Sequence, residues 1–134
     1  MDTFFKHTDL NRNEAEQIVS ETLNKCDDGE LYLENSKSET LVLDDNKIKT
    51  TSYNTSLGYG LRAVIGDVTA YSHSNEISKY SLKKSSNNLF STLKSKKGTY
   101  DRSTSRTNVK LYSDINPIEA KPLKAKIDIL KKVD

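Results

Sequence analysis

Residues 30–75 read ELYLENSKSETLVLDDNKIKTTSYNTSLGYGLRAVIGDVTAYSHSN, and short apolar runs alternate there with clusters of turn-forming residues. The apolar runs recur at intervals of roughly 8 to 12 residues, which is typical of an antiparallel β-meander. Asp44-Asp45-Asn46 and Gly66-Asp67 are predicted to form tight turns, because Asp, Asn and Gly tolerate left-handed backbone. We therefore expect about five strands, over residues 30–36, 40–44, 47–53, 57–65 and 68–73.

The strand predicted over 57–65 holds the candidate interaction residues. Gly58 and Gly60 alternate onto one of its faces, which indicates that another group approaches that face closely or that the strand bends. The Gly-x-Gly pair matches a phosphate loop only weakly, because it enters a strand and not a helix. Arg62 shares the face of the two glycines and is placed to bind a carboxylate there. The alternative for Arg62 is a surface side chain or a structural ion pair.

Helical periodicity appears on both sides of the meander. Asn13 and Glu16 resemble a capping box that opens a helix, and Asp27-Asp28-Gly29 ends it. Its expected buried stripe is Ala15, Ile18, Val19, Thr22, Leu23 and Cys26. Cys26 is interpreted as a small buried apolar residue and not as a nucleophile.

A second helix is predicted over 74–93, capped by Ser74 or Asn75. Its stripe is sparse, with polar residues at Ser85 and Asn88, which indicates close packing of small side chains or an incomplete partner surface. The expected stripe is Ile77, Tyr80, Ser81, Leu89 and Leu93.

Residues 95–108 are predicted to form a loop, and an amphipathic helix is expected after Pro122. Its apolar stripe is Leu123, Ile127, Leu130 and Val133. The expected fold is thus α+β, with two or three helices packed on the meander. We place one domain over 1–94, and expect 95–134 to begin a further region that is missing here.

Composition narrows the class of protein. The 134 residues carry a net charge of +2, so no global field favours nucleic acid, although residues 79–110 are rich in Lys and Arg. That basic segment is either a nucleic-acid surface or a solvated face. The sequence shows no signal peptide and no apolar run of the ~20 residues that a membrane span needs. A cytoplasmic protein without a membrane anchor is the default expectation.

The sequence offers no recognisable catalytic centre. His7 and His73 are its only histidines, and neither belongs to a His-Glu-x-x-His or His-Glu-x-x-x-His zinc motif. Ser72 and Ser74 beside His73 form no defensible triad. We therefore predict no catalytic, cofactor-binding or metal-binding residues in this chain.

The order and spacing of these pieces resemble the N-terminal part of the TldD/PmbA family, once called modulators of DNA gyrase. The resemblance is carried by Asp28-Gly29-Glu30-Leu31-Tyr32, the run 39–45, Ser52-Tyr53-Asn54, Gly58-Tyr59-Gly60-Leu61-Arg62-Ala63 and Ala70-Tyr71-Ser72. Asp114-Ile115-Asn116-Pro117 and residues 126–130 are more similar to the TldD branch.

The resemblance implies a zinc metalloprotease system that cleaves peptides, commonly built from two related subunits. The zinc-binding helix of the family lies in its C-terminal part, so this chain is expected to be a fragment or split-gene product that is inactive alone. The expected partner is the rest of the peptidase or a second TldD/PmbA-type subunit. A homo-oligomer and an extended peptide bound to a strand edge are further alternatives. Binding of nucleic acid or gyrase through residues 79–110 is the competing hypothesis.

Overall fold

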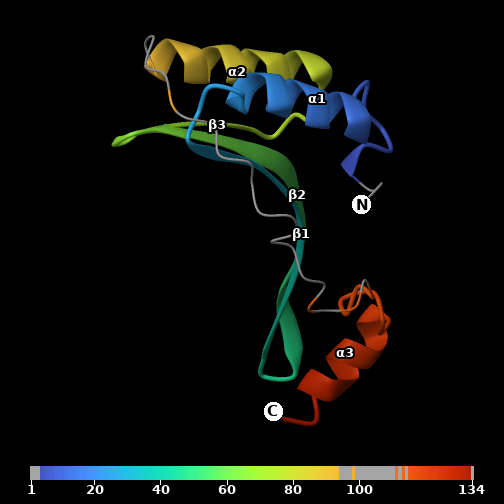
Figure 1. The fold of residues 1–134 in the computed structure, drawn as a ribbon. Helices are drawn as coiled ribbons and strands as arrows, with labels where there is room; N and C mark the ends of the chain where they lie inside the picture. The colour runs from blue at the N-terminus through green and yellow to red at the C-terminus, as the bar shows by residue number, and fades with distance from the viewer. Residues whose placement is uncertain (1–3, 94–97, 99–110, 112, 114, 134) are drawn as a thin grey trace. The chain divides into compact units, whose positions relative to one another are not determined.

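The computed structural model describes residues 4–93, 98, 111, 113 and 115–133 (Figure 1). Its elements are α1 (Arg12–Leu23), β1 (Asp28–Asp44), β2 (Lys47–Ile65), β3 (Val68–Ser74), α2 (Lys79–Leu93) and α3 (Leu123–Leu130). The strands form one sheet in the order β1-β2-β3, so β2 is central. The chain divides into two compact units, one of residues 1–35 and 56–105, the other of 36–55 and 106–134. The α+β class is confirmed.

The prediction of five strands is wrong, because three longer strands replace them. The ranges 30–36 and 40–44 both belong to β1, and 47–53 and 57–65 both belong to β2. The predicted breaks at 37–39 and 54–56 are polar but contain neither Gly nor Pro, and all of these side chains except that of Glu39 are exposed. Ladder hydrogen bonds join backbone groups, so polar residues on a solvated ribbon do not interrupt pairing.

Both predicted tight turns are present. Asp45 and Asn46 link β1 to β2 with φ of 50° and 57°. Positive φ at both central residues defines a type I′ hairpin. Gly66 has φ of 56°, whereas Asp67 is not left-handed, which is the pattern of a type II′ turn. The second hairpin sets the β2–β3 register, in which Ile65 pairs with Val68 and Tyr59 pairs with Ser74.

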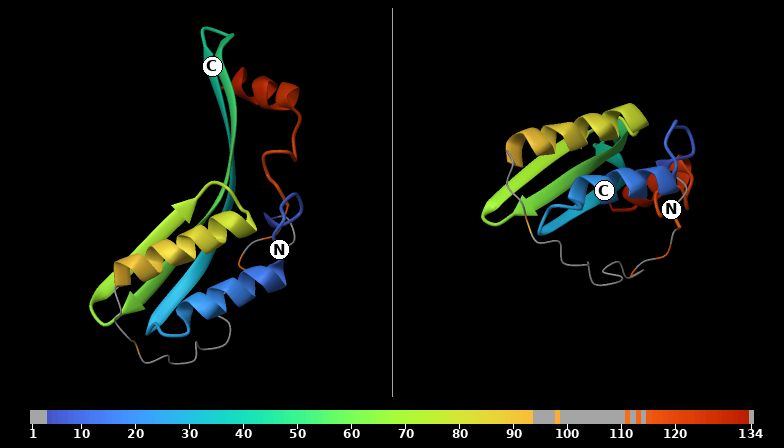
Figure 2. Two further views of the ribbon diagram at one scale, coloured as in Figure 1. Left: turned by 90° about the horizontal axis from the view of Figure 1, so that it is seen from above. Right: turned by 45° about the horizontal axis from the view of Figure 1, so that its top comes forward.

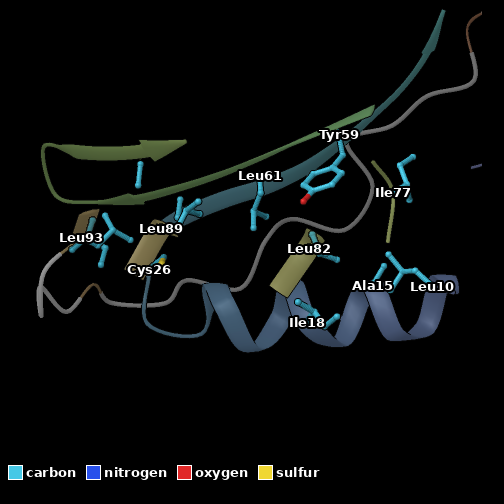
Figure 3. Close-up of a cluster of buried hydrophobic side chains, with 13 residues drawn as sticks. Leu10, Ala15, Ile18, Cys26, Tyr59, Leu61, Ile77, Leu82, Leu89 and Leu93 are labelled. Atoms are coloured by element: carbon cyan, nitrogen blue, oxygen red, sulfur yellow. The ribbon is translucent and has the colours of Figure 1, made fainter. Parts of the chain in front are cut away.

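Helices α1 and α2 cover one face of the sheet in the first unit, and they lie side by side there (Figure 2). The core lies between these helices and the sheet, where Tyr59 and Leu61 of β2 point toward Leu82 and Leu89 of α2 (Figure 3). Leu61 and Ala63 are completely buried, and Cys26 is buried as expected. The stripe predicted for the first helix is confirmed for Ala15, Ile18 and Thr22, which are buried.

The helix starts differ from the predicted ones. The capping box of α1 uses Asn11 and Glu14, two residues before the predicted pair, and Asn11 Oδ1 accepts from the Glu14 amide at 3.0 Å. The helix ends at Leu23, before the predicted Asp-Asp-Gly stop. Helix α2 begins at Lys79, where the Ser78 hydroxyl accepts from the Ser81 amide at 3.0 Å. Several Ser and Asn residues in each segment have cap chemistry, so sequence alone does not select among them.

The predicted stripe of α2 is right for Ser81, Leu89 and Leu93 but wrong for Tyr80, which is 72% exposed. Ser85, one polar position of the predicted stripe, is buried together with Ser86, so small side chains pack closely at this interface as expected, whereas Asn88 is exposed. The predicted domain boundary at residue 94 stays a prediction, because residues 94–97 and 99–110 lie outside the described part of the chain. The described helices include none that is long and apolar enough for a membrane span.

Candidate interaction surface

The sheet face that α1 and α2 leave uncovered carries the three residues singled out from the sequence. Along β2, Tyr59, Leu61 and Ala63 are buried toward the helices. Because side chains alternate along a strand, Gly58, Gly60 and Arg62 belong to the opposite face. The structure therefore brings the predicted residues onto one surface, although their role in binding stays a prediction.

The two glycines allow β3 and its side chains to approach β2 closely. A Cβ atom at Gly58 would lie 2.7 Å from the backbone oxygen of Ser74. A Cβ atom at Gly60 would lie 2.5 Å from the hydroxyl and 2.9 Å from Cε2 of Tyr71. The group that approaches this face is thus the neighbouring strand, with the Tyr71 ring lying over Gly60.

Arg62 joins β2 to β1 through two carboxylates. Its Nη2 lies 2.8 Å from Asp28 Oδ2, and its Nε lies 3.0 Å from Glu30 Oε1. The hydrogen bond from Arg62 holds the pKa of Asp28 below its ordinary value, and the same carboxylates raise the pKa of Arg62. An external carboxylate would have to displace two internal partners, so the geometry matches a structural ion pair.

The remaining groups on this face are aromatic and polar. The Tyr71 and His73 rings stack with centroids 5.8 Å apart and an interplanar angle of 27°. The serines beside His73 are engaged elsewhere, since Ser72 donates to Ser85 at 3.0 Å and Ser74 accepts from the Glu76 amide at 3.0 Å. This surface thus exposes the stacked Tyr71 and His73 rings, and neither Ser72 nor Ser74 is hydrogen-bonded to His73.

Zinc in proteins is held by clustered His, Cys, Asp or Glu side chains. Within the described ranges, no three His, Cys, Asp or Glu side chains are grouped so that they could hold a metal ion. Cys26 directs its Sγ to the Thr22 carbonyl at 3.7 Å, and burial together with the Asp27 charge raises the pKa of its thiol. A buried thiol with a raised pKa is a poor source of the thiolate that binds zinc. The residues described here do not fit a zinc centre.

Buried polar side chains join α2 to β2 and to α1, and the sequence did not predict their contacts. We call them the polar seam: Thr22, Tyr59, Ser81, Ser85 and Ser86. The Tyr59 hydroxyl lies 2.9 Å from both Ser81 Oγ and Ser85 Oγ. Thr22 of α1 and Ser86 of α2 form a second buried pair at 2.7 Å. The polar positions in the α2 stripe were the available signal, but sequence alone could not supply their partners. The seam satisfies the polar groups that the close helix packing buries.

The second unit holds a separate set of polar contacts. Lys126 of α3 forms a short ion pair with Glu39 of β1, and its Nζ also donates to the Ile118 carbonyl at 2.6 Å. Lys37 of β1 lies 2.9 Å from Glu119, which raises the pKa of Lys37 and lowers that of Glu119. These ion pairs connect the segment that contains α3 to the part of β1 and β2 that belongs to the same unit, residues 36–55.

Comparison with known proteins identifies the family. The family model described as PmbA/TldA metallopeptidase domain 1 matches residues 29–95, half of the chain. The chain belongs to the PmbA/TldD family. This agrees with the sequence resemblance, and the matched range contains all three strands except the first residue of β1, together with α2.

Two curated relatives of this family member are metalloprotease TldD homologues. The one from Buchnera aphidicola subsp. Acyrthosiphon pisum is 30% identical over 107 residues, which cover 79% of this chain and 22% of the relative. The one from Haemophilus influenzae is 33% identical over 112 residues, which cover 81% of this chain and 23% of the relative. The match thus extends over less than a quarter of the length of these relatives.

Proposed function

We propose that this chain is the non-catalytic first domain of a TldD-like metalloprotease, a class of enzyme that hydrolyses peptides. The observation that carries the proposal is the match to domain 1 of the family, in a chain that spans 22–23% of two curated metalloproteases. The donor groups of the described residues do not fit a metal centre. The part of the enzyme that binds the metal would therefore lie outside the described part of the chain.

The proposed role of the domain is association with the catalytic part, or with a second related subunit, so that it shapes access of a peptide to the active site. This role is supported by the uncovered sheet face, where Tyr71 and His73 are exposed and neither Ser72 nor Ser74 is hydrogen-bonded to His73. A cytoplasmic location is part of the same proposal.

Nucleic-acid binding is not favoured by the structure. Lys79, at the start of the basic segment, is paired with Glu14 at 2.8 Å and donates its amide to Asp9 at 3.0 Å. Much of the segment, residues 94–97 and 99–110, lies outside the described residues. The aromatic platforms that single strands stack on are also sparse there, since Tyr80 and Phe90 are the only aromatic residues among 79–93.

A domain exchange tests the proposal. The matched part of the Haemophilus influenzae homologue is replaced by the matched part of this chain, and cleavage of an unstructured peptide is measured with zinc present. We expect the chimera to cleave the peptide and the homologue lacking its first domain to lose activity. Zinc content and thermal unfolding of each protein show whether the catalytic part is folded. Full cleavage by the folded, truncated homologue would contradict a role for this domain.

A further inference from the structure

The outer edge of β3 presents a row of backbone groups that point away from the sheet. β3 is the last strand of the sheet, and β2 is its only neighbour in the strand order (Figure 2). Ile65 and Val68 flank the two-residue turn and form the first hydrogen-bonded pair of the ladder. Hydrogen-bonded and non-hydrogen-bonded pairs alternate along antiparallel strands, so the amide and carbonyl groups of Thr69, Tyr71 and His73 face outward.

A hydrogen bond on the other side of β2 confirms this direction. The Val64 carbonyl accepts from the amide of Asp27, the residue directly before β1, at 2.8 Å. Thr69 lies opposite Val64 in the register, so its backbone groups point toward the free edge. Within the described ranges, the outward amide and carbonyl groups of Thr69, Tyr71 and His73 have no hydrogen-bond partner. Such an edge is a template for pairing with another strand.

This edge lacks the features by which proteins usually discourage pairing, which are charged side chains and Pro. The seven residues of β3 include no Pro and no Asp, Glu, Lys or Arg. The opposite edge strand, β1, has charged side chains along its length: Asp28, Glu30, Glu34, Lys37, Glu39 and Asp44. The Tyr71 ring leaves the backbone of β3 accessible, because it lies over Gly60 of β2 and not over the edge.

The pattern of the outward groups is self-complementary. Tyr71 is the middle one of the three outward residues, so a two-fold axis beside it sets Tyr71 opposite its own copy and Thr69 opposite the partner's His73. In this antiparallel register each opposed pair exchanges both backbone hydrogen bonds, and no like charges meet. An extended peptide could pair with the edge in several registers, whereas a second copy satisfies every outward group in this one.

We propose that two copies of this chain associate through β3 in this register and form one continuous sheet across the two-fold axis. A strand pair of this length is a small interface, so the dimer is weak and reversible. The inference goes beyond the proposed function, because it concerns the chain alone and needs no peptidase activity.

Disulfide trapping of the purified chain tests the register. Tyr71→Cys places two thiols beside the axis, with Cα atoms about 5.5 Å apart, which is within disulfide reach. Thr69→Cys places its two thiols four residues apart along the strands, which is on the order of 13 Å and too far. We expect mild oxidation to link Tyr71→Cys into a dimer and to leave Thr69→Cys and His73→Cys monomeric when each is alone.

An equimolar mixture of Thr69→Cys and His73→Cys should form the mixed dimer, because these positions face each other across the axis. The wild-type chain is the control, since its single cysteine, Cys26, is buried. Absence of a dimer from Tyr71→Cys, or a dimer from Thr69→Cys alone, would contradict the register.

Charge variants test the association without a disulfide. Thr69→Lys with His73→Lys sets lysines opposite each other, and should weaken self-association about tenfold in sedimentation equilibrium. Thr69→Lys with His73→Glu sets opposite charges against each other in the same register, and should restore association in a salt-dependent way. Both variants change the same exposed positions, so thermal unfolding shows whether each is folded. Equal self-association of the two folded variants, or a wild-type chain that stays monomeric at about 1 mM, would refute the dimer.

The dimer and the proposed function fail in different ways. An edge that pairs instead with an extended peptide or with a strand of another polypeptide gives no Tyr71→Cys dimer, and the proposal is then wrong. If the chain is monomeric but the chimera cleaves the peptide, only the dimer is rejected. If the disulfide dimer forms and the chimera is folded but inactive, only the proposed function is rejected.

Discussion

The glycines of β2 differ in what a side chain would meet. At Gly58 the obstacle is the Ser74 carbonyl, which is backbone, whereas at Gly60 it is the end of the exposed Tyr71 side chain. We expect Gly58→Ala to destabilise the fold by about 1–3 kcal/mol, because backbone must shift. Gly60→Ala should change stability by less than about 1 kcal/mol, since Tyr71 can swing away. Urea unfolding of both variants measures the contrast, and equal losses would contradict it.

The Tyr59 hydroxyl forms hydrogen bonds with two serines of the buried polar seam, Ser81 and Ser85. Tyr59→Phe removes the partner of Ser81 and one partner of Ser85, which keeps its bond to Ser72. We expect a loss of about 1–2 kcal/mol of unfolding free energy, because Ser81 is left buried without this partner. Tyr80→Phe, at an exposed position, is the matched control and should leave stability unchanged. A similar loss in both variants would count against the seam.

The ion pair of Arg62 predicts a pH response with a definite sign. The folded pKa of Asp28 lies below its unfolded value, so the pair stabilises the fold above about pH 4. That contribution is lost as the pH falls through the lower folded pKa. Arg62→Gln should raise the pKa of Asp28 toward its ordinary value, measured by NMR titration of its carboxyl carbon. Lys49→Gln, in the other unit, should leave the pKa of Asp28 unchanged. An unchanged pKa of Asp28 in Arg62→Gln would refute the assignment.

Among the elements, α1 allows a direct test of which residue caps it. Asn11 accepts from the Glu14 amide and Glu14 reaches back to the Asn11 amide at 3.3 Å. Asn11→Ala should cost about 1 kcal/mol. Asn13→Ala, at the cap predicted from sequence, should have no cost, because Asn13 lies inside the first turn with its side chain exposed. Thermal unfolding distinguishes them, and a larger loss at Asn13 would show that the helix starts later.

The elements also show how far sequence alone could reach. Hairpin turns and buried stripes were predictable, because left-handed backbone and core contact demand particular residue types at Asp45, Gly66 and Leu61. That residues 30–36 and 40–44 form one continuous strand was not predictable. Pairing in this exposed part of the sheet depends on the partner strand, and it leaves no pattern of apolar residues in the sequence. The face shared by Gly58, Gly60 and Arg62 followed from alternation. The two carboxylates that pair with Arg62 could not be predicted in this way, because they lie on β1 and reach Arg62 only through the pairing of β1 with β2.

For the molecule as a whole, the family was recognisable from the order of short motifs, whereas the division into two units was not. The units share the strands β1 and β2, so their boundaries cross elements that have no break in sequence. The contacts of Lys37 and Lys126 with Glu119 and Glu39 join residues 82 and 87 positions apart. No local pattern encodes such pairs, and only the folded ribbon brings them together.

We propose that this chain is a first domain that catalyses nothing by itself, and the donor groups of its described residues do not fit a metal centre. The most direct measurement is the zinc content of the purified 134-residue chain after equilibration with Zn²⁺ and removal of excess metal, with His73→Ala as the matched variant. We expect no stoichiometric zinc in either protein and no cleavage of an unstructured peptide. Stoichiometric zinc in the wild-type chain that is lost in His73→Ala would contradict it.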